Sequence, residues 1–352
     1  MEQAVVDIGA ALEAALTTIA VSVVVGAIGA AIAFIIRLIK GEGALALLVG
    51  LDTFITTAAG SFLAWLVLRV LLELTGNSDA GAAVFGTLFL IWPGLVDVGW
   101  AGITAIFRPE AELVLIDAAA LPWFAFAVGA GVGLFDGYRR IHRWKGMGIL
   151  KFVADVTWGL PLAVNAFIIH VRNVPGLLKV DPVDGRRVTV HEDAPRVGTH
   201  RYLKGFRLKA GYAFTQGSVI SNLEVDGGLT PSAPGFAPLL AHETVHVFQN
   251  RVFGPTFWYS YVFWLVGVGL VAVIVSAFAK PKTGTAAGQS IPFWWAYMDN
   301  PWEVWAYSKN PGARTWVTDG SLCWPPLAVI VTTVIAAVPA IAVFVTIVAA
   351  AF

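Results

Sequence analysis

Long apolar runs separated by short polar stretches make up most of this 352-residue chain. A helix needs about 20 apolar residues to cross the ~30 Å hydrocarbon core of a bilayer. Runs of at least that length lie at 10–37, 44–74, 80–107, 111–136, 256–279 and 325–350. They predict a mainly α protein, built as a multi-pass bundle of transmembrane helices with four spans in its N-terminal part.

The stretch 149–170 is long enough to span a membrane but differs from the other runs. It contains Asp155 and His170, and Gly159-Leu160-Pro161 interrupts it. Glycine and proline weaken or bend a helix. We therefore expect an interfacial or partly buried helix here.

Residues 171–255 follow a different pattern, in which charged residues, glycine and proline are frequent and no apolar run can span. Short strands are predicted at 187–191, 202–208 and 211–220, the last two as a pair. A helix then begins near Pro238 and ends at Gly254-Pro255, a typical stop signal. This pattern predicts a small α+β domain inserted between membrane segments. The expected divisions are 1–148, 149–255 and 256–352.

Composition supports an integral membrane protein. The chain is 57% hydrophobic and 13% charged, with a mean hydropathy of +0.75, whereas soluble domains carry about 25% charged residues. Its formal net charge is zero and it has no long basic run, which argues against nucleic-acid binding. The single cysteine, Cys323, excludes a disulfide within the chain. Any metal site must therefore use histidine and carboxylate ligands.

Candidate chemistry lies in the last predicted helix, where residues 242–246 read His-Glu-Thr-Val-His. Residues four apart share one face of a helix, so His242 and His246 can reach one Zn²⁺. Glu243 stands beside them, where it can accept a proton from water at the metal. This is the HExxH signature of zinc metallopeptidases. The alternatives are an accidental match and a helix with two surface histidines.

A catalytic zinc site needs a third protein ligand. A metzincin-type third histidine would lie six residues after His246, where Val252 stands, so that class is excluded. His142 lies in a basic run and is expected at the surface. The better candidate is Glu303, in the segment Asn300-Pro301-Trp302-Glu303-Val304-Trp305-Ala306-Tyr307.

Together, His242, Glu243, His246 and Glu303 resemble the gluzincin clan of zinc peptidases, in which a glutamate of a second helix is the third ligand. Gln249 and the NPxExxAY segment are also similar to those of bacterial HExxH proteins. The resemblance implies a zincin-like inserted domain that binds Zn²⁺ through His242, His246 and Glu303, with Glu243 as the base. It leaves the membrane part unexplained.

Residues around these four can support the site or have ordinary roles. Ala306 is small and would let the two helices approach, and Tyr307 can donate to the oxyanion that develops on a scissile carbonyl. Alternatively, Glu303 belongs to a capping arrangement with Asn300, and Tyr307 is a membrane-interface anchor. Gln249 shares the face of His246 and contacts either the site or solvent.

The predicted strand that ends at Ile220 precedes the HExxH helix. In zinc peptidases of this general type, an edge strand in this order lines the cleft and pairs with extended substrate. A kink at Gly217-Ser218 would let a substrate backbone approach. An ordinary half-buried hairpin would show the same pattern.

One apolar run, 256–279, separates His246 from Glu303. A single crossing would place the two on opposite sides of the membrane, so segment 283–308 must fold back. Six of the fourteen tryptophans lie between residues 294 and 324, and tryptophan prefers the membrane interface. We expect the site at or just below one membrane face, with a fully intramembrane site as the alternative.

Basic residues indicate which face carries the site. A group follows the fourth run closely, and the positive-inside rule places it in the cytoplasm. Arg37, Lys40 and Arg108 oppose this assignment if the spans alternate strictly. We expect a bacterial cytoplasmic membrane with the site on the cytoplasmic face. The basic group comprises Arg139, Arg140, Arg143, Lys145 and Lys151.

Charged residues inside the apolar runs, Asp52, Arg69, Asp97 and Asp117, are costly in hydrocarbon. They mark either an ion pathway or structural pairs, and pairing, for example of Arg69 with an aspartate, is favoured. Gly129 and Gly133 are spaced for close helix packing.

The function predicted from these observations is a membrane-embedded zinc metalloendopeptidase. Its partners would be the lipid bilayer and a polypeptide substrate. The alternative is a membrane structural, transport or assembly protein in which zinc only stabilises the inserted domain.

Overall fold

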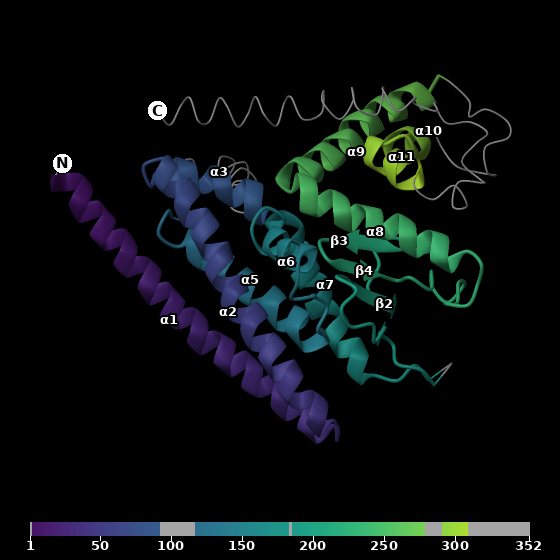
Figure 1. Ribbon diagram of the computed structural model, residues 1–352. Helices are drawn as coiled ribbons and strands as arrows, with labels where there is room; N and C mark the ends of the chain where they lie inside the picture. The colour runs from purple at the N-terminus through teal and green to yellow at the C-terminus, as the bar shows by residue number, and fades with distance from the viewer. Residues whose placement is uncertain (1, 92–116, 183–184, 279–290, 309–352) are drawn as a thin grey trace, which may run out of the picture. The chain divides into compact units, whose positions relative to one another are not determined.

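The computed structural model describes residues 2–91, 117–182, 185–278 and 291–308, which are mainly helical with one small sheet (Figure 1). The helices are α1 (Glu2–Ile39), α2 (Gly43–Leu74), α3 (Asp79–Leu90), α5 (Leu121–Arg139), α6 (Met147–Val156), α7 (Leu160–Leu178), α8 (Phe236–Phe253), α9 (Pro255–Ser276), α10 (Ile291–Phe293), the π-helical turn η1 (Trp294–Met298) and α11 (Pro301–Ser308). The strands are β1 (Val190–His191), β2 (His200–Lys204), β3 (Phe214–Gln216) and β4 (Val219–Ser221).

The contacts divide the chain into two compact units. The first contains the described residues up to 175 together with 192–200. The second contains 176–191 and the described residues from 201 onward. The HExxH helix and Glu303 therefore belong to one unit.

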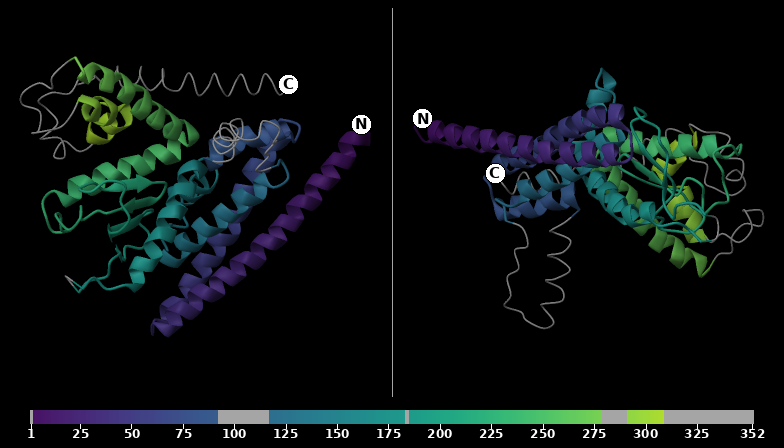
Figure 2. Two further views of the ribbon diagram at one scale, coloured as in Figure 1. Left: turned by 180° about the vertical axis from the view of Figure 1, so that it is seen from behind. Right: turned by 90° about the horizontal axis from the view of Figure 1, so that it is seen from below.

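In the first unit, α2 packs between α1 and α5, and the three helices lie side by side (Figures 1 and 2). Among the described helices, α1, α2 and α9 are long and apolar enough to cross a membrane. The outer face of α1 exposes large apolar side chains, as expected of a helix in contact with lipid. They include Leu12, Leu16, Val24, Ile28 and Ile35.

Glycines set the close approach of α2 and α5. A Cβ on Gly133 would lie 2.2 Å from the carbonyl oxygen of Thr56, and one on Gly129 would lie 2.3 Å from that of Gly60. The hydroxyl of Thr56 also donates a hydrogen bond to the carbonyl of Gly133 at 2.5 Å. The close packing predicted at Gly129 and Gly133 is confirmed, because no side chain fits between the two backbones.

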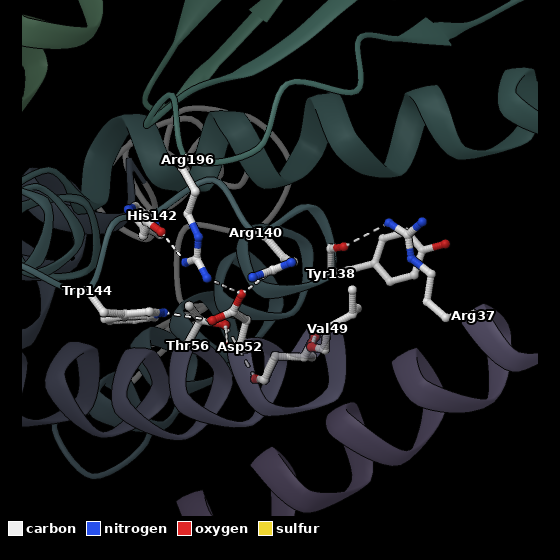
Figure 3. A network of polar contacts seen from close by, with 10 residues as sticks. Arg37, Val49, Asp52, Thr56, Tyr138, Arg140, His142, Trp144 and Arg196 are labelled. Carbon is white, nitrogen blue, oxygen red and sulfur yellow. Dashed lines mark hydrogen bonds and ion pairs between the residues drawn. The ribbon is translucent and has the colours of Figure 1, made fainter. Parts of the chain in front are cut away.

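Asp52 on α2 is buried and fully paired (Figure 3). Its Oδ2 accepts hydrogen bonds from Arg140 at 2.6 Å and Arg196 at 2.8 Å, and Trp144 donates to its Oδ1 at 2.8 Å. Structural pairing, rather than an ion pathway, accounts for this buried charge. The three donors fasten the loop after α5 and segment 192–200 to α2.

The other charged residues of the apolar runs have local partners. Arg69 pairs with Glu73 one turn along α2, so the suggested pairing with an aspartate is wrong. Asp117 accepts a hydrogen bond from the backbone N–H of Ala120 at 2.7 Å, within the turn that precedes α5. Asp97 lies outside the described residues.

Three expected spans differ from the structure or lie beyond it. The run 80–107 is represented by α3, which ends at Leu90, and α5 begins at Leu121 instead of residue 111. The run 325–350 lies outside the described residues.

The stretch 149–170 forms α6 and α7, which meet at an 84° bend. The predicted break at Gly159-Leu160-Pro161 is confirmed, because α7 begins at Leu160.

The sheet of the second unit has the order β1-β2-β4-β3. Helix α8 packs against β3 and β4 over a small core of Ile220, Leu223, Phe236 and Val247. The single strand predicted over 211–220 is wrong: Gly217, at φ +56°, turns the chain into a β3–β4 hairpin. Strand β2 therefore neighbours β4, and β3 lies at the edge of the sheet.

The segment 291–308 folds back onto α9. The indole of Trp264 donates to the carbonyl of Trp295 at 3.0 Å, and the indole of Trp302 donates to the hydroxyl of Ser260 at 2.9 Å. The two α9 residues in these bonds, Trp264 and Ser260, lie in the first half of the helix. The return expected from the sequence therefore exists and brings α11 back toward α8.

Candidate metal centre

Helix α8 places both histidines of the HExxH motif on its buried face. The Nε2 atoms of His242 and His246 lie 3.2 Å apart. The two rings are nearly perpendicular, with an interplanar angle of 84°. Neither histidine is at the surface, since both are buried. Two buried imidazoles with adjacent Nε2 atoms form an arrangement suited to a shared ion.

Glu303 reaches the same point from α11. Asn300 caps this helix, because its Oδ1 accepts a hydrogen bond from the N–H of Trp302 at 3.1 Å. Glu303 therefore occupies a capping position by sequence, yet its side chain turns toward α8. Its Oε2 lies 3.1 Å from Nε2 of His242 and 3.4 Å from Nε2 of His246.

The separations among these three atoms match those of zinc ligands. With bonds of about 2.0–2.1 Å in a tetrahedral arrangement, neighbouring ligand atoms are about 3.3 Å apart. The observed separations are 3.1, 3.2 and 3.4 Å. Oε2 of Glu303 is buried and accepts no hydrogen bond within the described part of the chain. These residues can hold a metal ion.

Without a metal, the centre is an ion pair. Burial lowers the pKa of His246, but the neighbouring Glu303 carboxylate outweighs burial and raises that pKa to about 9. Burial raises the pKa of Glu303, whereas the charge of His246 holds it well below its ordinary value. A metal cation would therefore take the place of a proton on His246.

Gln249 holds His246 in position. Its Oε1 accepts a hydrogen bond from Nδ1–H of His246 at 2.8 Å, and its Nε2 donates to the carbonyl of Trp302 at 3.0 Å. This bond fixes the ring with Nε2 toward Glu303, the usual task of a residue behind a metal ligand. Of the two alternatives for Gln249, contact with the site is confirmed.

Tyr261 and Thr215 complete the surroundings of the metal group, and neither was predicted from the sequence. The hydroxyl of Tyr261 donates to Oε1 of Glu303 at 2.7 Å. The hydroxyl of Thr215, on β3, donates to Oε2 of Glu243 at 2.5 Å. Both contacts join segments far apart in the sequence, and no motif in the neighbouring residues marks Tyr261 or Thr215 as part of a site.

Glu243 and Tyr307 lie on the wall of a cavity of about 530 Å³ beside the metal group. The ring of Tyr307 is centred 4.2 Å from that of His242. Burial raises the pKa of Tyr307, so its hydroxyl stays protonated and can donate a hydrogen bond. Tyr297 lies on the same wall, and burial raises its pKa too. The remaining lining residues are Gly211, Tyr212, Ala213, Val225, Leu229, Gly235, Pro238, Leu239 and His242.

Edge strand β3 continues from the residues that line this cavity. Ala213 is part of the wall, and Phe214 begins the strand. The expected kink at Gly217-Ser218 is the turn of the β3–β4 hairpin. The start of the strand therefore adjoins the cavity.

The other histidines lie elsewhere. His142 is only 2% exposed, so the expectation that it lies at the surface is wrong. Its ring is held by a hydrogen bond to Asp136, which draws it into the interior. His191 in β1 packs against Tyr202, with ring centroids 4.7 Å apart. His170 and His200 are buried in the first unit, with Asp136.

No family model matches the chain, and no match is found among curated proteins or solved structures. The function therefore has to be inferred from the chemistry of the site.

Proposed function

We propose that this protein is a membrane-embedded, zinc-dependent metallopeptidase of gluzincin type. The observation that carries the proposal is the convergence of His242, His246 and Glu303 on one point. Glu243 stands beside that point on the cavity wall. A stabilising metal site needs the three ligands, whereas a hydrolase also needs a base and space for substrate.

The residues present suit zinc, which favours nitrogen and carboxylate ligands. Bound by His242, His246 and Glu303, zinc would polarise water and the scissile carbonyl, and would lower the pKa of the water toward about 7. Glu243 accepts the proton from the attacking water and returns it to the leaving amine. The hydrogen bond from Thr215 orients the Glu243 carboxylate for both transfers.

Tyr307 and Tyr297 supply hydrogen-bond donors on the cavity wall. Negative charge develops on the carbonyl oxygen as water adds, and donors already in place stabilise it. Tyr307 packs against the ligand His242, which places its phenol ring close to the metal group. We assign the donor role to Tyr307 first, because of this contact.

The substrate is an extended polypeptide. Strand β3 is the edge of the sheet, and an edge strand can pair with a peptide through backbone hydrogen bonds. The cavity beside Glu243 is large enough for side chains of the substrate. A peptide paired at the start of β3 runs past Glu243, since Thr215 contacts that residue.

Helix α9 supports a site close to one membrane face. Tyr261 contacts Glu303 and lies six residues after Pro255, about 9 Å along the helix. If α9 spans the bilayer, Glu303 then lies near headgroup depth. The outer face of α9 is apolar and exposed, as lipid contact requires. It includes Phe263, Val266, Leu270, Val273 and Ile274.

The arrangement of the first unit favours a cytoplasmic assignment for one of its ends. Arg37 and Lys40, at the end of α1, both donate hydrogen bonds to Tyr138 at the end of α5. Arg37 and Lys40 therefore lie at the same end of this unit as the basic group that begins at Arg139. The positive-inside rule places that end in the cytoplasm. We propose that the metal centre faces the cytoplasm as well.

Zinc-dependent cleavage of an unstructured protein such as β-casein tests the activity. The full chain, purified in detergent, should cleave it, and Glu243→Gln should lower kcat/KM by about 10²–10⁴-fold with zinc content unchanged. Glu192→Gln, outside the site, is the matched control. If the wild-type protein with zinc bound cleaves no peptide, in detergent or in a bilayer, zinc serves only to stabilise the fold. If Glu243→Gln cleaves as well as wild type, Glu243 is not the base and the proposed mechanism is rejected.

A further inference from the structure

The first unit contains a second group of metal-ligand side chains, separate from the centre on α8. Three of the six histidines of the chain gather around Asp136 of α5. His142 lies in the loop after α5, His170 on α7, and His200 at the start of β2. All four side chains are between 0% and 2% exposed. Such burial of a carboxylate requires compensation of its charge.

Asp136 is the centre of this group. Its Oδ1 lies 2.8 Å from Nε2 of His200, and its Oδ2 lies 2.6 Å from Nε2 of His142. The ring of His170 meets that of His200 edge-on at 4.3 Å and stacks on Phe135 at 4.3 Å. Ligand atoms of Asp136, His170 and His200 all lie within 4.8 Å of one another.

We propose that Asp136, His170 and His200 bind a second divalent metal ion of the zinc class. Two imidazoles and a carboxylate are common zinc ligands. His142 would not be a ligand; its hydrogen bond to Oδ2 orients the carboxylate, and such a partner is typical of metal-bound carboxylates. The ion would lie between Nε2 of His200 and Oδ1, in place of their hydrogen bond, with the proton of the neutral imidazole on Nδ1. Zinc binding would draw these three donors, which now lie within 4.8 Å of one another, to separations of about 3.3 Å.

This second site is structural. Its donors are closed from solvent, whereas a catalytic zinc keeps a position accessible to substrate. It joins α5 and α7 to segment 192–200. The same segment is also fixed by Arg196, which bonds to Asp52 and to the carbonyl of His142 (Figure 3). The metal thus holds in place the segment that leads into β2, independently of any peptidase activity.

Metal content per chain tests this inference without relying on activity. The full chain in detergent, equilibrated with zinc and then desalted, should carry two zinc ions by plasma mass spectrometry. The double variant His242→Ala/His246→Ala leaves the second site untouched and should retain one. His170→Ala should also retain one, and His191→Ala, outside both groups, should retain two.

A double variant His242→Ala/His246→Ala that carries no zinc overturns the second site, even if His170→Ala fails to fold. Two ions in His170→Ala overturn it as well. One ion in the double variant together with an inactive wild-type protein would instead reject the proposed peptidase function and leave the second site standing.

Discussion

The hydroxyl of Tyr261 on α9 donates a hydrogen bond to Oε1 of Glu303 on α11 at 2.7 Å, across 42 residues of sequence. This contact connects the apolar helix that follows the HExxH motif to the residue that completes the metal group. It leaves Oε2 of Glu303 facing His242 and His246. The metal centre therefore forms because segment 291–308 returns along α9 and brings Glu303 to the two histidines of α8.

Tyr261→Phe should weaken zinc binding by about 10–100-fold, the usual effect of losing a partner that orients a metal ligand. The phenylalanine ring keeps the packing against Phe257 and removes only the hydrogen bond. Competition with a chromophoric chelator measures the affinity. Tyr259→Phe, two residues away on the same helix, should bind zinc as the wild type does. Equal affinities for Tyr261→Phe and wild type would contradict the role of Tyr261 in orienting the Glu303 carboxylate.

Zinc uptake should release a proton from His246 at neutral pH. In the metal-free protein its pKa is raised from 6.5 to about 9 beside Glu303, so binding competes with protonation below pH 9. Apparent affinity should rise with pH, by up to tenfold per unit, between about 6.5 and 9 and then level off. Titration calorimetry in buffers of different ionisation enthalpy counts the released proton.

The raised pKa of His246 also makes the stability of the metal-free protein depend on pH. The folded pKa of His246 is raised, so the stabilisation is complete below about pH 6.5 and is lost as pH rises through 9. His246→Gln, measured without metal, should remove this dependence from a denaturant titration. Affinity and stability that stay constant from pH 7 to 9 would show that His246 and Glu303 do not interact.

Gly133→Ala should destabilise the first unit by about 1–3 kcal/mol, the cost of overpacking. The added Cβ meets the backbone of Thr56 on α2, which cannot rotate away. Gly267→Ala, also within a helix, meets nothing within 4 Å and should be neutral or slightly stabilising. Thermal unfolding in detergent compares the two variants. A Gly133→Ala protein as stable as Gly267→Ala would refute close packing of α2 and α5.

Cysteine labelling tests the proposed membrane side. In a Cys323→Ser background, single cysteines at Lys40 and Lys209 occupy exposed positions in the first and second unit. Both should resist a membrane-impermeant maleimide in intact cells and react with it in inverted vesicles. Labelling of Lys209→Cys alone from outside the cell would place the metal centre on the opposite face from the basic end of α1.

Features determined by neighbouring residues were predictable from the sequence. The spacing of His242 and His246 places them on one helix face whatever the rest of the chain does, because helix geometry is local. Gly254-Pro255 ends α8 for a similar reason. The apolar runs of α1 and α2 likewise follow from composition alone.

Only the tertiary structure decided which distant residues meet. The sequence suggested Glu303, but its approach to the histidines depends on the return along α9, and nothing local indicates Tyr261 or Thr215 as partners. His142 looked like a surface residue because its neighbours are basic, yet a hydrogen bond to Asp136 holds it inside. Local sequence determines helix faces and turns, whereas burial and long-range pairing depend on how the whole chain packs.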